Sequence, residues 1–144
     1  MDPIILAAQK AHKRVWKLSG DASTGTKKAI QITQDWQNLA SDPKKRWIQA
    51  EYQVAACVKQ RFDMVDLKRG IAYELKVSPN NAHMEVYRDL FKVLVHNEYS
   101  DKPLKKFVFI TPTVSADRLR QKPFWNEVVK LAKHYGLKVS VEGI

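Results

Sequence analysis

The stretch that most constrains the fold of this chain runs from Arg61 to Ser78 and reads RFDMVDLKRGIAYELKVS. Two runs of strand-forming residues flank Lys68-Arg69, and Gly70 supplies the backbone freedom that a tight hairpin turn requires. We therefore predict two antiparallel strands joined by a turn at Lys68-Arg69. The cross-strand pairs expected from this turn are Asp66 with Ile71, Val65 with Ala72, Met64 with Tyr73 and Asp63 with Glu74.

This hairpin gathers charged side chains on one face. Because side chains alternate along a strand, Asp63, Glu74 and Lys76 fall on the same side of the sheet. Two opposed carboxylates repel unless a cation lies between them, and hard divalent cations prefer carboxylate oxygens. The lysine adds a positive charge beside that cation. The pattern therefore indicates a metal-dependent catalytic site. Two alternatives stay open: a surface salt bridge among the same residues, and a register slip that exchanges Asp63 for Asp66.

The order of these residues resembles the motif of a known enzyme superfamily. Asp63, a short hairpin and then Glu74-Leu75-Lys76 are similar to the motif of the PD-(D/E)XK nucleases, with Phe62 where the motif has proline. The resemblance implies that Mg²⁺, or Mn²⁺ in its place, is held by Asp63, Glu74 and the carbonyl of Leu75. It also implies that Lys76 orients a water molecule or stabilises charge on a phosphate.

A further acidic residue lies before the hairpin. Asp42 and Pro43 are suited to the start of a helix, which we predict to run to about residue 59. At 100° per residue, Glu51 falls within an apolar stripe of this helix. The other members of the stripe are Trp47, Val54, Ala55 and Val58. A carboxylate facing a core is costly unless it is paired or bound to a metal. The resemblance implies that Glu51 is a further metal ligand, and the alternative is a rim glutamate paired with a lysine.

The rest of the chain alternates helical and strand patterns. Helices are predicted over 3–18, 26–40, 81–96 and from 116 onward with a restart at Pro123, a loose loop over 19–28, and strands over 105–111 and 137–141. The apolar residues expected in the core of the last helices are Tyr87, Leu90, Phe91 and Leu94, then Phe124, Trp125, Val128, Val129, Leu131 and Ala132. We therefore predict an α/β fold with a mixed central sheet flanked by helices, and with extra N-terminal helices.

The length of 144 residues indicates a single domain with one modest core. We divide it into an N-terminal helical extension (1–42), a core with the motif (43–111) and a C-terminal helix and strand (112–144). The resembled family usually has another strand between its first core helix and the aspartate strand. The residues before Arg61 leave little room for that strand.

Charge and cysteine content restrict the partners and the compartment. The formal net charge is +10, which predicts an anionic partner, with nucleic acid before a membrane surface. The lone Cys57 excludes an intrachain disulfide and a cysteine-rich zinc site, which suits the cytoplasm. No apolar run is long enough to span a membrane. The basic residues expected to contact DNA phosphates are Lys44, Lys45, Arg46, Arg61, Lys68 and Arg69.

These patterns and the resemblance together predict a metal-dependent DNA endonuclease. We expect site-specific double-strand cleavage of the restriction or homing type. Because cutting both strands needs two active sites and the chain is small, we expect a homodimer or a higher homo-oligomer. Two other functions stay open: a Holliday junction resolvase of the same fold, and a non-catalytic nucleic-acid-binding module.

Overall fold

A five-stranded mixed sheet forms the centre of the molecule, as predicted. The computed structural model describes residues 1–18, 25–78 and 81–144, so most of the predicted 19–28 loop lies outside it. The strands lie in chain order: Ile48–Gln53 (β1), Arg61–Asp66 (β2), Ile71–Leu75 (β3), Lys106–Thr111 (β4) and Lys138–Gly143 (β5). The first three strands pair antiparallel, and β3, β4 and β5 pair parallel.

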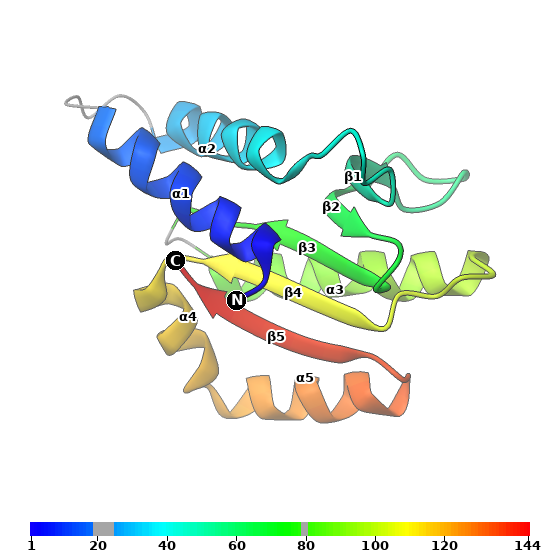
Figure 1. Ribbon diagram of the computed structural model, residues 1–144. Helices are drawn as coiled ribbons and strands as arrows, with labels where there is room; N and C mark the ends of the chain where they lie inside the picture. Colours follow the sequence, from blue (N-terminus) through cyan, green and yellow to red (C-terminus); the bar gives the residue numbers. More distant parts are fainter. Residues whose placement is uncertain (19–24, 79–80) are drawn as a thin grey trace.

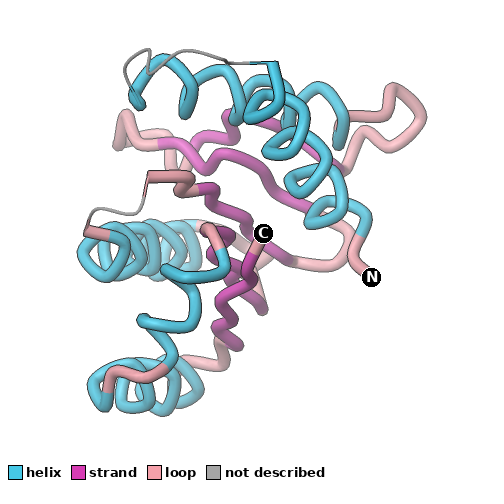
Figure 2. Tube along the Cα trace, turned by 90° about the vertical axis from the view of Figure 1, so that its left-hand side faces the viewer, coloured by secondary structure: helices cyan, strands magenta, loops and turns pink. Residues whose placement is uncertain are grey.

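Helices cover both faces of this sheet and make a three-layer sandwich (Figures 1 and 2). The helices are Pro3–Leu18 (α1), Gly25–Ala40 (α2), Ala82–Tyr99 (α3), Thr113–Arg120 (α4) and Pro123–His134 (α5). The N-terminal pair α1 and α2 lies on one face, and α3, α4 and α5 lie on the other. The predicted N-terminal helices and the helix restart at Pro123 are thereby confirmed.

The sheet separates two apolar layers, and strand alternation decides which side chain enters which layer. In β4, Val108 and Ile110 pack toward α1 and α2, whereas Phe107 and Phe109 pack toward α3. Both faces of β4 are therefore buried, which explains its unbroken apolar run. Trp36 of α2 is fully buried in the first layer, where its indole N–H donates to the carbonyl of Ile4 at 3.0 Å.

The helix predicted over residues 42–59 is wrong, because strand β1 occupies the middle of that segment. Asp42 and Pro43 begin a turn, in which the Lys45 N–H donates to the Asp42 carbonyl at 2.8 Å. The following residues, IQAEYQ, alternate half-buried and exposed positions. This period of two was present in the sequence, but the apolar residues at helical spacing masked it. The segment before Arg61 therefore has room for a strand, and β1 pairs antiparallel with β2.

Helix α3 turns a different face to the sheet from the one predicted. Its buried residues are Ala82, Val86, Asp89, Val93 and His96. Of the residues predicted for the core, Phe91 is exposed, and Tyr87, Leu90 and Leu94 are only partly buried. In α5, Trp125 and Ala132 are buried as predicted, but Phe124 and Leu131 are exposed. An apolar surface thus remains open across these two helices.

Candidate active site

The candidate site lies where the β2–β3 ladder ends. The predicted register is confirmed for its first three pairs, from Asp66–Ile71 to Met64–Tyr73. The fourth predicted pair is replaced by a side-chain contact, because the backbone N–H of Leu75 donates to Asp63 Oδ2 at 2.9 Å. The carboxylate of Asp63 is therefore fixed at the end of the ladder, beside residues 74–76.

Asp63 and Glu74 form a pair of carboxylates in a poorly solvated place. Glu74 is only 4% exposed, and burial raises the pKa of its carboxyl well above the ordinary range, with further increases from the charges of Asp63 and Asp89. Burial also raises the pKa of Asp63, although the Leu75 N–H and the charge of Lys92 offset part of that rise. Such a pair is stabilised as anions only when more positive charge is close by.

Lys92 of α3 supplies part of that positive charge. Its Nζ lies 3.0 Å from Glu74 Oε1, 2.9 Å from Asp89 Oδ1 and 3.0 Å from the carbonyl oxygen of Arg61. Burial lowers the pKa of Lys92, but the charges of Glu74 and Asp89 outweigh that and hold it above its ordinary value. The sequence analysis did not select Asp89 or Lys92, the two α3 residues of this cluster. The available signal was an acid–base pair three positions apart on a helix next to the motif.

Lys76 follows β3 directly and borders an open groove of about 460 Å³ between α2 and the end of β3. Its backbone N–H donates to the carbonyl of Ile110 at 2.8 Å, which anchors the lysine beside β4. Its Nζ lies 3.7 Å from Glu85 Oε1 of α3. The side chain is 29% exposed, and its separation from Glu85 is longer than a hydrogen bond.

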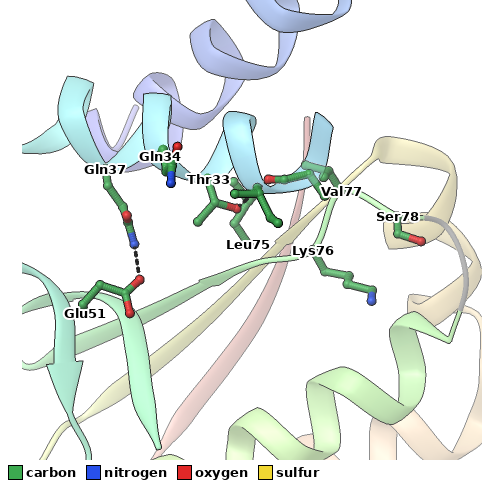
Figure 3. A pocket seen from close by; sticks show the side chains of 10 residues that line it. Thr33, Gln34, Gln37, Glu51, Leu75, Lys76, Val77 and Ser78 are labelled. Atoms are coloured by element: carbon green, nitrogen blue, oxygen red, sulfur yellow. Dashed lines mark hydrogen bonds between the residues drawn. The ribbon is translucent and has the colours of Figure 1, made fainter. Parts of the chain in front are cut away.

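Glu51 reaches the same groove from strand β1 and not from a helix (Figure 3). Its carboxylate is exposed, which corrects the expectation that it faces a core. The Nε2 of Gln37 donates to Glu51 Oε1 at 2.8 Å and to the carbonyl of Asp63 at 3.0 Å. Gln37, which sequence reasoning missed, thus joins α2, β1 and β2. Figure 3 shows Glu51 and Gln37 together on one side of the groove and Lys76 on the other.

The expected metal ligands are only partly brought together. Asp63, Glu74 and Leu75 meet at the end of the ladder, whereas the Glu51 carboxylate is engaged by Gln37. Within residues 1–18, 25–78 and 81–144, no group of three or more His, Cys, Asp or Glu side chains is arranged to hold a metal ion. The donor set is thus the buried carboxylate of Glu74, the half-buried carboxylate of Asp63 and a neighbouring carbonyl.

Five of the six basic residues predicted to bind DNA lie toward the hairpin turn, and Arg61 lies at the other end of the hairpin. Lys44, Lys45 and Arg46 are exposed in the turn before β1, and not at a helix start as predicted. This turn adjoins the hairpin, because the Leu67 N–H donates to the Trp47 carbonyl at 2.8 Å. The exposed Lys68 places its Nζ 4.9 Å from the centre of the Trp47 ring.

Arg61 and Arg69 lie at opposite ends of the hairpin. Arg61 is exposed at the start of β2, close to Lys92. Arg69 donates to Asp66 at 2.6 Å, to Asp2 at 2.8 Å and to the hydroxyl of Tyr73 at 2.8 Å. These contacts give Arg69 a structural role, and its predicted contact with DNA has no support from them. The contact with Arg69 also pairs the carboxylate of Asp66, which lies away from the Asp63 site.

No family model, no curated protein and no solved structure matches the chain. Among the helices of the described residues, none combines the length and the apolar character needed to cross a membrane.

Proposed function

We propose that this protein is a metal-dependent endonuclease that hydrolyses phosphodiester bonds in DNA by site-specific double-strand cleavage. The observation that carries the proposal is the pair of carboxylates at the end of the hairpin beside Lys76, with Glu74 buried and Asp63 half-buried. The strongly basic composition supports DNA as the substrate. A cytoplasmic location is part of the same proposal.

The arrangement of elements adds support. From α2 to β4 the order is a helix, three antiparallel strands, a helix and a strand parallel to the third. The resemblance to the PD-(D/E)XK nucleases implies a strand before the aspartate strand, and β1 fills that position. Glu51, Asp63 and Lys76 then come from three successive parts of this unit and lie around one end of it.

The two carboxylates fit a hard divalent cation, since burial and mutual repulsion leave them short of positive charge. Asp63, Glu74 and the Leu75 carbonyl would hold Mg²⁺, or Mn²⁺ in its place. The bound ion would polarise a phosphodiester and lower the pKa of the attacking water.

The chain's own residues supply the remaining functions. Lys76, partly exposed on the groove, would stabilise negative charge on a phosphate that enters it. Glu51 on the opposite side would orient a water molecule, with Gln37 fixing its carboxylate. Arg61, exposed at the start of β2, would contact the DNA backbone.

The test is cleavage of supercoiled plasmid and of a four-way junction, with Mg²⁺ or EDTA. We expect discrete linear products that require Mg²⁺, and a loss of at least about 100-fold in Lys76→Ala. Lys130→Ala, which removes an exposed lysine of α5, is the matched control and should cut normally. Resolution of the junction alone would assign the protein to the resolvases. Salt-sensitive DNA binding without cutting of either substrate would leave a binding module and refute the catalytic proposal.

A second copy of the chain is the partner that the proposal requires. Residues of α3 and α5 that were predicted for the core, together with Tyr135 directly after α5, line an apolar groove of about 310 Å³. Its most exposed members are Phe91, Phe124, Leu131 and Tyr135, each at least 60% exposed. Covering these four side chains would bury roughly 500 Å² per copy, or about 1,000 Å² in a pair, which is the lower range of specific interfaces. We therefore assign this surface, the α3–α5 face, to a homodimer contact.

A further inference from the structure

Lys92 occupies a position like that of a bound cation. Its ammonium lies 2.9–3.0 Å from three oxygen atoms that come from three different elements. One belongs to Glu74 of β3, one to Asp89 of α3 and one to the backbone carbonyl of Arg61 in β2. Since an ammonium has three donors, these contacts use all of them. Lys92 therefore provides positive charge to a cluster of oxygen atoms.

The charges around Lys92 do not balance. Asp63, Glu74 and Asp89 carry three negative charges when ionised, and Lys92 carries one positive charge. One divalent cation would neutralise the remaining charge of −2. Arg88 approaches Asp89 only at 3.5 Å from a largely exposed side chain, so water screens its effect.

We propose that Lys92 takes the place of a second metal ion, so that the site holds one divalent cation and not two. The inference rests on the proposed metal-dependent function. Two-metal sites place their ions about 3.5–4 Å apart, each among shared carboxylates. Here the ammonium engages one oxygen of Glu74 and one of Asp89, and it repels a second cation from that side. Lys92 is thus a positioning residue, which fixes Glu74 before the metal and the DNA bind.

The stoichiometry of Mn²⁺ binding, measured by calorimetry and by electron paramagnetic resonance, tests this role directly. We expect one Mn²⁺ per wild-type chain. Lys92→Met removes the ammonium and keeps most of the side-chain length, and it should raise the number to two, with the spectral broadening of a coupled Mn²⁺ pair. Lys92→Met combined with Asp89→Asn should return the number to one.

Two further variants separate this role from a loss of folding and from a general effect of charge. Lys92→Gln keeps a hydrogen-bond donor without the charge and should also bind two ions if Lys92→Met is too unstable to study. Lys76→Met removes the neighbouring lysine and should leave the number at one. Circular dichroism would verify that each variant is folded.

The outcomes separate this inference from the nuclease proposal. Two ions in the wild type, or one ion with unchanged affinity in folded Lys92→Met and Lys92→Gln, would overturn the role of Lys92. A change from one ion to two in a protein that cuts no DNA would support the role of Lys92 while refuting the nuclease. Absence of Mn²⁺ binding in every variant would refute both.

Discussion

At the scale of single residues, Glu51 has the least ordinary backbone near the candidate site. Its φ is +51°, which is left-handed and uncommon for a residue with a Cβ. The left-handed conformation costs roughly 1–2 kcal/mol per residue for L-amino acids. Strain of this size persists where surrounding contacts hold it, and it is concentrated at functional sites. Here the contact from Gln37 holds the Glu51 carboxylate on the groove.

The left-handed backbone of Glu51 predicts a difference in stability between two variants. Glu51→Gly should be more stable than Glu51→Ala by about 1 kcal/mol, because both lose the carboxylate but only glycine relieves the left-handed conformation. Urea unfolding of the two variants measures the difference. If alanine is as stable as glycine, the backbone at residue 51 is not strained. Both variants should cut DNA less efficiently than the wild type if Glu51 orients the water molecule.

The residues of the site differ in how far the sequence could predict them. The alternation of side chains and the turn at Lys68-Arg69 were enough to bring Asp63 and Glu74 together, since strand pairing is local. Glu51 was chosen for its position in a helix that does not exist, and it reaches the groove by another route. Gln37 had no sequence signal, because only tertiary packing brings α2 to the hairpin. Lys92 had the signal of its spacing from Asp89, but that spacing does not show that the pair faces Glu74.

At the scale of elements, two errors have one physical cause. The sequence of β1 fits both an alternating strand pattern and apolar residues at helical spacing, and α3 has two apolar stripes that could each face the core. Local sequence cannot distinguish these alternatives. Packing in the sheet does, because β1 pairs with β2, and α3 buries Val86 and Val93 against the strands. The elements with a single pattern, such as β4 and α1, were predicted within one or two residues.

A network of polar side chains links the beginning of α1 to the hairpin. Asp2 accepts hydrogen bonds from Arg69 and from the Tyr73 hydroxyl, both at 2.8 Å, and Arg69 also donates to Asp66 at 2.6 Å. Burial would raise the pKa of Asp2, but the bonds from Arg69 and Tyr73 outweigh it and hold the pKa below its ordinary value. The network therefore depends on ionised Asp2.

This network predicts a dependence of stability on pH. Because the folded protein lowers the pKa of Asp2, the stabilisation is complete above the unfolded value of about 3.9 and is lost as the pH falls through the folded value. The urea midpoint of the wild type should exceed that of Asp2→Asn at pH 6, and the difference should shrink below about pH 3.9. A difference that is independent of pH would exclude an electrostatic origin. Asp101→Asn, in an exposed turn, is the control.

At the scale of the whole molecule, the exposed α3–α5 face predicts self-association. Phe91→Glu should shift the mass in solution toward that of one chain, 16.6 kDa, because a carboxylate cannot be buried in an apolar contact without a partner. Light scattering coupled to size exclusion measures this. Val114→Glu, at an exposed position of α4, is the matched control. A wild-type protein that is monomeric at all concentrations would contradict the assignment of this face.

Self-association also predicts the pattern of DNA products. If the dimer cuts both strands, Phe91→Glu should convert linear plasmid products into nicked circles, since a lone copy has one active site. The per-strand cutting rate at saturating protein should change much less than the product pattern. Unchanged linear products from a monomeric variant would show that one copy cuts both strands.

The basic surface near the hairpin turn predicts how DNA affinity depends on salt. Replacing Lys44, Lys45 and Arg46 together by glutamine should reduce the slope of log affinity against log salt by about 3, because each phosphate contact contributes roughly 0.9. Fluorescence anisotropy at several salt concentrations measures the slope. The control is the triple glutamine substitution of Lys122, Lys130 and Lys133 around α5. An equal change in both variants would indicate a diffuse effect of net charge.

The order of the strands has a consequence for synthesis of the chain. The hairpin partners β1, β2 and β3 leave the ribosome together, but β4 begins roughly 30 residues after β3 ends. At translation rates of 5–20 residues per second, one edge of β3 stays unpaired for roughly 2–6 s before β4 is synthesised. Every side chain of β3 is buried in the finished protein, and apart from Glu74 and Tyr73 they are aliphatic, so the nascent edge is largely apolar as well as unpaired. We therefore expect chaperones to bind the nascent chain mainly in the interval between synthesis of β3 and synthesis of β4.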